Sequence, residues 1–575
     1  MTIAIGQMKI TAGAPAVNKQ IMLDMVRQAA AAGAELIVFP ELAVSGFLCG
    51  DLLGYPAFIE ECERAGEELA AASQNGIRIV FGNLGRDHRG RVANAVFLAE
   101  QGQLRCMDVL LDETALPTGD DHFVNHNSAQ VCNIEIDGLP RRIAFSLSDW
   151  RQPPAQIFGV DLIIDLTLRP LTLEDGALPQ PPRGCRYLSV NAYSLQNSGK
   201  TCWLFAGGSS YWDEGGRLLA DAGLFQSGLF LWHYDTGGER SAAWSADDLL
   251  LAGLTSGVRC FTEQIRARDA VIGLSGGIDS ALAAAIYTDV LGPDHVHLIS
   301  MPTHFNSQTT KSLAARMADG LGCRFAEMPI ENAVHELFAD FERLRFTQQN
   351  AAPTGVTLSP LARENVMARD RCRLLAAAAA AVGGIFTCNG NKAELTVGYA
   401  TFYGDLAGAF AAQADLWKFQ VYQAAAAFQR LYPAAPLNEI AAIRPSAELS
   451  DAQAVDQGLG DPLHYAYHDY LLRWWVEQGA DIGQALTHYL DGTLAERIGC
   501  APQELQQACP DRRAFVADCE RWWKAYRGMG IPKRIQAPPL LALSRHPFGE
   551  PLPQAQGPVW FPAEYEALKG ELGLD

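Results

Sequence analysis

A hydroxyl- and glycine-rich segment, Ser275-Gly276-Gly277-Ile278-Asp279-Ser280, carries the residues whose types and spacing most clearly indicate chemistry. It follows an apolar run that starts at Val271 and leads into a helix-compatible stretch at 281–291. An apolar strand, a small-residue turn and a helix together aim backbone N–H groups at an anion. The pattern therefore predicts a phosphate-binding loop.

Two common phosphate loops do not fit this segment. A Walker A loop ends in Gly-Lys-Ser/Thr, whereas the final pair here is Asp279-Ser280, and the dinucleotide pattern Gly-x-Gly-x-x-Gly is absent. Ser275 and Ser280 instead bracket two glycines, so hydroxyls and bare amides can reach a phosphate, and Asp279 can hold a magnesium ion. An ordinary glycine-rich turn between a strand and a helix is the alternative.

A second polar group lies on a predicted helix in the segment 363–373. Asn365, Arg369 and Arg373 recur at intervals of four residues, which places them on one helical face. Because the chain has a net charge of -20, an anionic substrate has to be met by such a local group of cations. A solvated surface helix is the alternative.

The elements that position these groups belong to two predicted α/β domains, one at 1–240 and one at 245–575. In the first domain, apolar runs alternate with helical patterns, as in a layered α/β fold. Its predicted strands are 3–10, 34–40, 77–81, 143–146, 162–166, 186–191 and 201–205. In the second domain, the strand before the loop, the strand at 295–300 and the helix at 312–321 predict a doubly wound parallel sheet.

Composition sets limits on the function. A chain of 575 residues with 49% hydrophobic and 19% charged residues fits a globular protein of two to four domains. The net charge of -20 argues against nucleic acid and anionic membranes as partners. Thirteen scattered cysteines, with no Cys-x-x-Cys pair, favour a reducing cytoplasm, and the N-terminus does not resemble a signal peptide. The apolar stretch 374–388 is shorter than a membrane span and predicts a buried helix that enters a strand.

The loop resembles the pyrophosphate loop of N-type ATP pyrophosphatases, which adenylate a substrate and release pyrophosphate. By itself it would leave GMP synthetase, asparagine synthetase and tRNA-modifying enzymes open. Further segments in family-like order resemble NAD synthetases: Glu364-Asn365 through Arg371, Asn389-Gly390-Asn391-Lys392-Ala393-Glu394, Gly398 through Asp405, Asp415-Leu416-Trp417-Lys418 and Pro445-Ser446-Ala447-Glu448-Leu449.

This resemblance implies a set of binding residues. Those implied for ATP are Ser275, Gly276, Gly277, Asp279, Ser280, Met301, Asn389, Lys418 and Ser446. Those implied for deamido-NAD are Asn365, Arg369, Asp405 and Glu394, and Asp279 and Glu394 would hold Mg²⁺. Asp279, Lys418 and Arg369 would be catalytic. Asn389 departs from the family, which has threonine there, and no tightly bound organic cofactor is expected.

The implied reaction has two steps. The nicotinate carboxylate of deamido-NAD attacks the α-phosphorus of ATP, and ammonia then displaces AMP from the acyl-adenylate. After the last motif, the segment 451–462 contains glycines and a proline, which predicts a loop that either covers the site or merely connects helices. The tryptophan pairs that follow at 474–475 and 522–523 are expected to be core residues of a packed extension, in which the sequence shows no independent chemistry.

The first domain resembles the nitrilase superfamily, in particular the glutaminase domain fused to NAD synthetases. The resemblance rests on Phe39-Pro40-Glu41, Leu116-Pro117, Asp149-Trp150, Val190-Asn191 and Ala206-Gly207-Gly208-Ser209-Ser210. It implies an α-β-β-α sandwich that hydrolyses amides with a glutamate base, a lysine that stabilises the oxyanion and a cysteine nucleophile.

Only one of these three groups is present at its expected position. Glu41 fits the base, but the lysine position, three residues before Leu116, holds Glu113, and the cysteine position, four residues before Trp150, holds Ser146. A hydroxyl is a much weaker nucleophile than a thiolate, and a carboxylate repels the oxyanion that a lysine would stabilise. The domain is therefore predicted to be a degenerate glutaminase.

The expected activity is ammonia-dependent NAD synthesis from deamido-NAD and ATP by a cytoplasmic homo-oligomer. A first alternative is a glutamine-dependent synthetase with a working glutaminase, which would require the catalytic lysine and cysteine to lie elsewhere, for example at Lys200 and Cys202. A second alternative is a non-catalytic scaffold or regulator.

Overall fold

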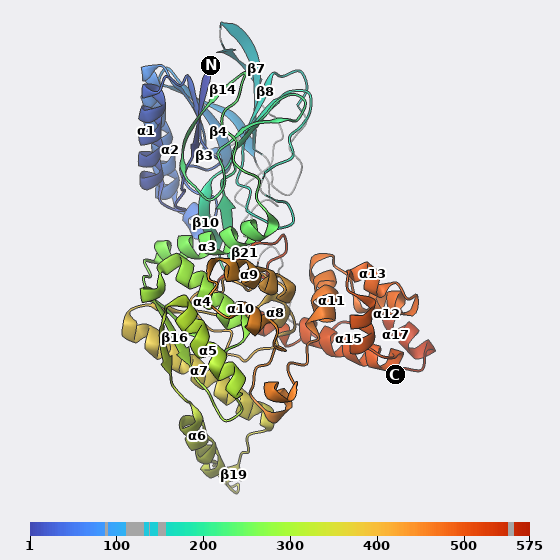
Figure 1. Cartoon of the computed structure of the whole chain (residues 1–575). Coiled ribbons are helices and arrows are strands. Elements are labelled where there is room, and N and C mark those ends of the chain that lie inside the picture. The colour runs from blue at the N-terminus through green and yellow to red at the C-terminus, as the bar shows by residue number, and fades with distance from the viewer. Residues whose placement is uncertain are drawn as a thin grey trace. The chain divides into compact units, whose positions relative to one another are not determined.

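The computed structural model describes residues 1–86, 90–110, 131–136, 138–147, 157–176, 178–549 and 557–574 (Figure 1). The chain divides into two compact units, Met1–Gly253 and Leu254–Asp575. The boundary that the sequence suggested near residue 245 lies just before α3 (Ala246–Ile265), the helix within which the division falls.

The first unit contains two six-stranded sheets. In the first sheet the order is β14-β1-β2-β3-β4-β5, and β1, β2 and β3 are parallel to one another. Its strands are β1 (Thr2–Gln7), β2 (Leu36–Val38), β3 (Arg78–Arg86), β4 (Val92–Glu100), β5 (Gln103–Leu110) and β14 (Gly228–His233). Two helices, α1 (Pro15–Ala31) and α2 (Pro56–Ala72), lie beside this sheet (Figure 1).

The second sheet has the order β13-β12-β9-β8-β7-β6, with β7, β8 and β9 parallel. Its strands are β6 (Val131–Ile136), β7 (Leu139–Leu147), β8 (Leu162–Leu166), β9 (Arg186–Val190), β12 (Ser210–Trp212) and β13 (Leu218–Asp221). A separate antiparallel pair is formed by β10 (Tyr193–Ser198) and β11 (Thr201–Ala206). Apolar side chains from the first sheet, such as Val38, and from the second, such as Phe145, form one buried core.

The sheet-on-sheet packing follows from strand burial. The strands 36–38, 162–166 and 201–206 are buried at every position, as predicted from their continuous apolar runs. The hairpin of β4 and β5 was not predicted from the sequence. The pairing of the two strands shifts register between Val96 and Phe97, which interrupts the alternation of buried and exposed side chains. The α/β class and the nitrilase-like layering are as predicted.

In the second unit, a four-stranded parallel sheet has the order β17-β16-β15-β20. Its strands are β15 (Ala270–Gly273), β16 (Val296–Ser300), β17 (Arg324–Glu327) and β20 (Ile385–Phe386), connected by α4 (Ile278–Leu291), α5 (Gln308–Leu321), α6 (Glu331–Arg343) and α7 (Pro360–Val382). Strand β15 has β16, the next strand in the sequence, on one side and β20, a much later strand, on the other. The loop after β15 therefore lies at a switch point, where such sheets bind ligands.

The remaining elements of the second unit are mostly helical. They are β18 (Arg345–Phe346), β19 (Thr354–Gly355), α8 (Lys392–Val397), α9 (Lys418–Leu431), α10 (Leu437–Ala441), α11 (Tyr465–Glu477), α12 (Ile482–Leu490), α13 (Leu494–Ile498), α14 (Pro502–Ala508), α15 (Arg512–Arg527), α16 (Gly530–Gln536), β21 (Leu540–Ala542) and α17 (Ala563–Glu571). Trp474, Trp475, Trp522 and Trp523 are buried in their core, as predicted.

One sequence prediction for this unit is wrong. The stretch 374–388 was expected to be a buried helix entering a strand; the helix and the strand exist as α7 and β20, but a face of the helix is exposed. Four alanines lie on this face, at positions 376, 377, 380 and 381. Alanine is apolar but small, so the hydrophobicity of the stretch does not distinguish a buried helix face from an exposed face lined by alanines. Within the part of the chain that the structure describes, no helix is long and apolar enough to cross a membrane.

Candidate active site

The loop between β15 and α4 is held by its own two serines. The Ser280 hydroxyl accepts a hydrogen bond from the Ser275 backbone N–H at 3.2 Å and donates one to the Gly277 carbonyl at 2.9 Å. The Gly277 N–H donates to the Ser275 hydroxyl at 3.2 Å. Gly276 has a φ of 87°, and a Cβ there would lie 2.2 Å from the Thr310 carbonyl oxygen. Glycine is therefore required where the loop passes α5.

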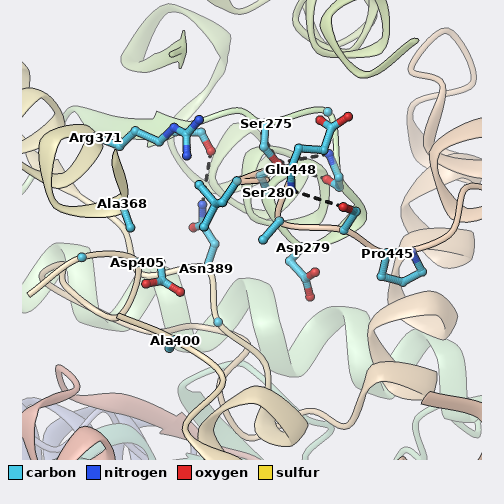
Figure 2. Close-up of a pocket in the computed structure, with 18 of the residues that line it drawn as sticks. Ser275, Asp279, Ser280, Ala368, Arg371, Asn389, Ala400, Asp405, Pro445 and Glu448 are labelled. Carbon is cyan, nitrogen blue, oxygen red and sulfur yellow. Dashed lines mark hydrogen bonds between the residues drawn. The ribbon is translucent and has the colours of Figure 1, made fainter. Parts of the chain in front are cut away.

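This loop forms one side of a pocket of about 440 Å³, called here the phosphate-loop pocket (Figure 2). The other sides come from α7, from the segment 398–405 and from the segment 444–461. The predicted residues that line it are Ser275, Gly276, Gly277, Asp279, Ser280, Met301, Asn365, Asn389, Glu394, Asp405, Lys418 and Ser446. Sequence motifs that are far apart in the chain thus meet at one cavity.

Asp279 and Lys418 form an ion pair at the end of the loop. The Lys418 Nζ lies 2.5 Å from the Asp279 Oδ2, and the Asn391 side chain donates to the Asp279 Oδ1 at 3.0 Å. Burial alone would lower the pKa of Lys418, but the charges of Asp279 and Glu394 raise it above its ordinary value. Lys418 therefore stays charged and holds Asp279 toward the pocket.

Two further carboxylates, Glu394 and Asp461, face the same ammonium group. Burial, with the Asp279 charge as the next cause, raises the pKa of Glu394 to about 8, and burial raises the pKa of Asp461. With a pKa of about 8, Glu394 holds its proton at neutral pH, and a bound cation would displace that proton. Three carboxyl groups around one lysine offer more oxygen ligands than the lysine uses. This donor set fits a hard divalent cation such as Mg²⁺, which Asp279 and Glu394 would hold.

The sequence places Glu394 through a helix cap. Asn391 is the N-cap of α8, its side-chain oxygen accepts from the Glu394 N–H at 3.1 Å, and the Glu394 carboxylate accepts from the Asn391 N–H at 3.2 Å. This is a capping box, whose spacing is readable in Asn391-Lys392-Ala393-Glu394. The box leaves the Asn391 amide N–H₂ to bind Asp279, a contact that the sequence did not predict. Lys392 points away from the pocket and pairs with Asp415 at 2.8 Å.

On α7, the residues that face the pocket differ from the predicted face. The lining includes Asn365, Ala368, Arg371 and Leu375, whereas neither Arg369 nor Arg373 lines it. Arg369 donates to the Phe402 carbonyl at 2.9 Å, and Arg373 is exposed and pairs with Asp370. The intervals of four residues identified a face of the helix, but the face turned to the pocket is the neighbouring one (Figure 2).

Arg371 is the cation that the sequence missed on this helix. Its guanidinium donates to the Met301 carbonyl at 3.1 Å and to the Asn306 side chain at 3.3 Å. Burial lowers the pKa of Arg371 to about 10, so it stays charged at neutral pH. Arg371 therefore braces the wall of the pocket and adds positive charge to it.

Asn365 and Asp405 are linked through Thr401. The Thr401 hydroxyl donates to the Asn365 side-chain oxygen at 2.7 Å, and its N–H donates to the Asp405 carboxylate at 2.7 Å. Lys533 of α16 also lines the pocket and donates to the carbonyls of Gly398 and Ala400 at 2.7 and 2.6 Å. Lys533 is thus a lining residue from the C-terminal extension that the sequence did not predict, because only the tertiary fold brings it to the pocket.

The segment 451–462 contributes to the pocket rather than merely connecting helices. Gln453, Val455 and Asp461 line it. The Gln453 amide donates to the Tyr399 hydroxyl at 2.8 Å, and that hydroxyl donates to Asp461 at 3.0 Å. The segment therefore forms part of the pocket wall, and its role as a cover over the site stays a prediction.

The pocket gathers the cations that an acidic chain needs in order to bind an anion. Besides Lys418, Arg371 and Lys533, its lining includes Lys311 and Arg444. Together with the loop hydroxyls and the start of α4, these groups can bind a chain of phosphates, and the carboxylate cluster can hold the cation that accompanies it. This combination of cations, hydroxyls and carboxylates in one pocket supports phosphoryl or nucleotidyl transfer.

The first unit places Glu41 and Ser146 as buried polar residues. Glu41 follows β2, and its carboxylate accepts from the Asn94 side chain at 2.5 Å. A Cβ on Gly82 of β3 would lie 2.6 Å from the Glu41 Cα, so glycine permits this close approach. Ser146 lies near the end of β7, opposite Asp165 of β8. Glu113 lies outside the residues that the structure describes.

Five described cysteines of this unit, at positions 49, 62, 132, 185 and 202, do not have the character of nucleophiles. Burial raises the pKa of Cys49 to about 11 and of Cys62 and Cys202 to about 12, and it also raises the pKa of Cys132 and Cys185. Reactive thiols instead have a lowered pKa in a cationic environment. Burial lowers the pKa of Lys200 to about 8. The raised pKa of the Cys202 thiol argues against Cys202 as a displaced nucleophile.

Comparison with known proteins identifies both halves. The NAD synthase family model matches residues 250–499, and the carbon-nitrogen hydrolase model matches residues 2–113. A protein from Synechocystis named glutamine-dependent NAD(+) synthetase is 30% identical over 97% of this chain and 99% of its own length. A protein of the same name from Aquifex aeolicus is 25% identical over 83% of this chain and 89% of its own.

Solved structures show the same fold. A glutamine-dependent NAD(+) synthetase from Cytophaga hutchinsonii has a TM-score of 0.74 at 16% identity and covers 100% of this chain and 99% of its own. The glutamine-dependent NAD+ synthetase from Acinetobacter baumannii, solved with adenosine diphosphate, has a TM-score of 0.65 at 23% identity and covers 86% of this chain and 92% of its own.

Proposed function

Since the chain belongs to the two-domain NAD(+) synthetases, we propose that it forms NAD from deamido-NAD and ATP with free ammonia as the nitrogen donor. The observation that carries the choice of ammonia is Ser146, a hydroxyl at the end of β7 in the position expected for the nucleophilic thiol. Membership of this family and the convergence of the predicted residues on one pocket argue against a non-catalytic scaffold.

Adenylation is assigned to the phosphate-loop pocket. Ser275, Ser280 and the N-terminus of α4 bind the β- and γ-phosphates of ATP, and Lys418 fixes Asp279 beside them. Mg²⁺, held by Asp279 and Glu394, supplies charge neutralisation of the departing pyrophosphate when it is bound. Arg371 and Lys311 also line the pocket and offset the remaining phosphate charge.

Deamido-NAD is assigned to the side of the pocket formed by α7 and the segment 398–405. Asn365, Thr401 and Asp405 form one hydrogen-bonded group there, which can orient the nicotinate ring and ribose toward the α-phosphorus. Arg369 lies next to this group through its bond to the Phe402 carbonyl and stays a predicted contact to the dinucleotide. The segment 451–462 excludes water, which protects the acyl-adenylate from hydrolysis until ammonia attacks its carbonyl carbon.

The nitrogen source follows from the first unit. With Ser146 in place of a cysteine and Glu113 in place of a lysine, the groups that attack glutamine and stabilise its oxyanion are both replaced. Losing one oxyanion donor costs roughly 10²–10³-fold in rate, and a reversed charge adds repulsion. Glu41 alone cannot release ammonia, so ammonia enters from solution or from another protein.

Glutamine-dependent synthesis is the second candidate, because the relatives from Synechocystis and Aquifex aeolicus carry that name. Initial rates of NAD formation by the purified chain, with ammonium and with glutamine in parallel, separate the two. We expect turnover with ammonium and a rate with glutamine that does not exceed the rate without any nitrogen donor. Equal rates with the two donors would establish the second candidate instead.

We also propose that the chain acts as a homo-oligomer through the exposed face of α7. The alanines at 376, 377, 380 and 381 allow a second backbone to approach closely, and Phe325 and Met328 near the edge strand β17 are 38% and 48% exposed. Light scattering after size-exclusion chromatography tests this. Ala380→Arg should lower the mass to that of one chain, whereas Ala517→Arg, on the exposed side of α15, should not change it.

A further inference from the structure

We propose that His304, Glu331 and His335 form a binding site for a transition-metal ion of the zinc class. None of the three lines the phosphate-loop pocket, and none has a role in the chemistry described above. Their ligand atoms all lie within 4.8 Å of one another. The site is therefore separate from the carboxylate cluster of Asp279 and Glu394.

Both imidazole rings converge on one carboxylate oxygen. The His304 Nδ1 lies 2.7 Å from the Glu331 Oε1, and the His335 Nε2 lies 3.0 Å from the same atom. Ligands about 2.0 to 2.2 Å from a tetrahedral Zn²⁺ lie roughly 3.3 Å apart. The Glu331 oxygen would have to move away from the two rings by about 0.3 to 0.6 Å to admit the ion, which rotation of exposed side chains allows.

The backbone holds the three ligands in place before any ion binds. Glu331 and His335 lie one turn apart on α6, so their side chains share a face of the helix. The loop with His304 is tied to the start of α6 because the Ile330 N–H donates to the Pro302 carbonyl at 3.2 Å. The His304 N–H donates to the Glu331 Oε2 at 2.9 Å. A preorganised ligand set loses little conformational entropy on binding.

The donor set selects the class of ion. Two imidazoles and one carboxylate bind Zn²⁺ in a tetrahedral site whose fourth position is left to water, whereas Mg²⁺ and Ca²⁺ prefer oxygen ligands only. The histidine side chains are 58% and 59% exposed, so the ion can enter from solvent and keep a water ligand. The Mg²⁺ used with ATP should therefore not compete for this site.

An ion here would connect α6 to the wall of the phosphate-loop pocket. The loop 301–307 continues from His304 to Asn306, which contacts Arg371 and Glu448. Metal binding would hold α6 against this loop in addition to the buried contacts of Met301, Ile330 and Val334. The inferred role is structural, so it does not depend on whether ammonia or glutamine supplies the nitrogen.

The test is calorimetric titration of the EDTA-treated full-length chain with ZnCl₂, without ATP or Mg²⁺. We expect one binding event that His304→Ala and His335→Ala each weaken at least about tenfold. His295→Ala is the matched control, since His295 is also an exposed histidine paired with a carboxylate, and it should bind Zn²⁺ as the wild type does. Zn²⁺ should raise the melting temperature of the wild type but not of the two variants.

The proposal would be overturned by an absence of Zn²⁺ binding by the wild type or by equal binding by the wild type and both variants. It would also be overturned by a binding event that Asp279→Asn abolishes while His335→Ala retains it. Melting temperatures of the metal-free proteins check that the variants fold. Glu331→Gln, which keeps the size of the side chain, should weaken Zn²⁺ binding in the same way, and unchanged binding by this variant would also contradict the site.

Discussion

At the scale of single residues, the chemistry of the pocket depends on which cations reach it. The sequence identified Lys418 and Asp279 through their motifs, and the structure joins them at 2.5 Å. It could not identify Lys533, because a lysine on a C-terminal helix has no local pattern that points to a site. Helical spacing predicted that Arg369 and Arg373 face the substrate, whereas the arginine of α7 that lines the pocket is Arg371. The angle of a helix about its own axis is set by tertiary packing and not by its sequence period.

The pair Arg371 and Arg373 gives a matched test of this assignment. Arg371→Ala should lower kcat/KM for NAD formation with ammonium about 10- to 100-fold, because it removes charged hydrogen bonds to the Met301 carbonyl and to Asn306. Arg373→Ala, two residues further on α7, removes only an exposed ion pair with Asp370 and should stay within about twofold of the wild type. Steady-state kinetics with varied ATP measures both, and equal losses would contradict the orientation of α7.

A buried carboxylate makes the stability depend on pH. Burial of Asp469 in α11 raises its pKa to about 7, well above the ordinary value of an aspartate. The folded chain therefore binds this proton more tightly than the unfolded chain does. The free energy of unfolding should then fall as pH rises from about 4 to 7, by an amount on the order of a few kcal/mol.

Asp469→Asn removes this titration, so its melting temperature should change less between pH 5 and pH 8 than that of the wild type. Asp491→Asn, at an exposed position that ends α12, is the control and should keep the wild-type pH dependence. Melting temperatures of the wild type and of both variants at pH 5 and pH 8 measure this difference. A wild type that becomes more stable over this range, or a variant with the same slope, would show that Asp469 is not the group responsible.

At the scale of elements, the parallel sheet and its loop were predictable because strand, turn and helix follow one another in the sequence. The strand, loop and helix at 270–291 have the predicted order, and the switch point beside β15 explains why the pocket opens there. The segment 451–462 was not predictable in the same way. Its glycines indicate a turn, but its role depends on contacts of Gln453 and Asp461 with Tyr399, far away in the sequence.

Two glycines with a positive φ test how tightly this loop is packed. Gly276 has a φ of 87° and Gly292, at the end of α4, has a φ of 85°. A Cβ on Gly276 would lie 2.2 Å from the Thr310 carbonyl, whereas a Cβ on Gly292 would meet no atom within 4 Å. Both alanine variants carry the strain of a positive φ, roughly 1–3 kcal/mol, but only Gly276→Ala must also displace the loop or α5.

We therefore expect Gly276→Ala to lose measurable ATP binding and Gly292→Ala to bind ATP as the wild type does. Both variants should melt at lower temperature than the wild type. Calorimetric titration with ATP and Mg²⁺ gives the comparison. Wild-type affinity in Gly276→Ala would mean that the loop does not approach α5 as closely as described.

At the scale of the whole molecule, one chain combines a pocket lined by most of its predicted residues with a first unit that has Ser146 where the family resemblance places the nucleophilic cysteine. The α/β class of both halves was readable from apolar runs, because strands such as β8 and β11 are buried throughout. For the first unit, the prediction about its activity depends on the residue types at single positions, chiefly 113 and 146. Ser146 is a buried residue near the end of β7, and Glu113 lies outside the described residues.

The last prediction concerns the thiol that this unit lacks. Ser146→Cys should not give NAD formation from glutamine, because a thiolate attack also needs a cation for the oxyanion, and position 113 holds a glutamate. Ser146→Ala should leave the rate with ammonium unchanged, since the hydroxyl has no part in adenylation. Parallel assays of glutamate release and NAD formation measure both effects. If the wild type releases one glutamate for each NAD formed, and Ser146→Ala abolishes this release, then Ser146 is itself the nucleophile and the first unit is an active glutaminase.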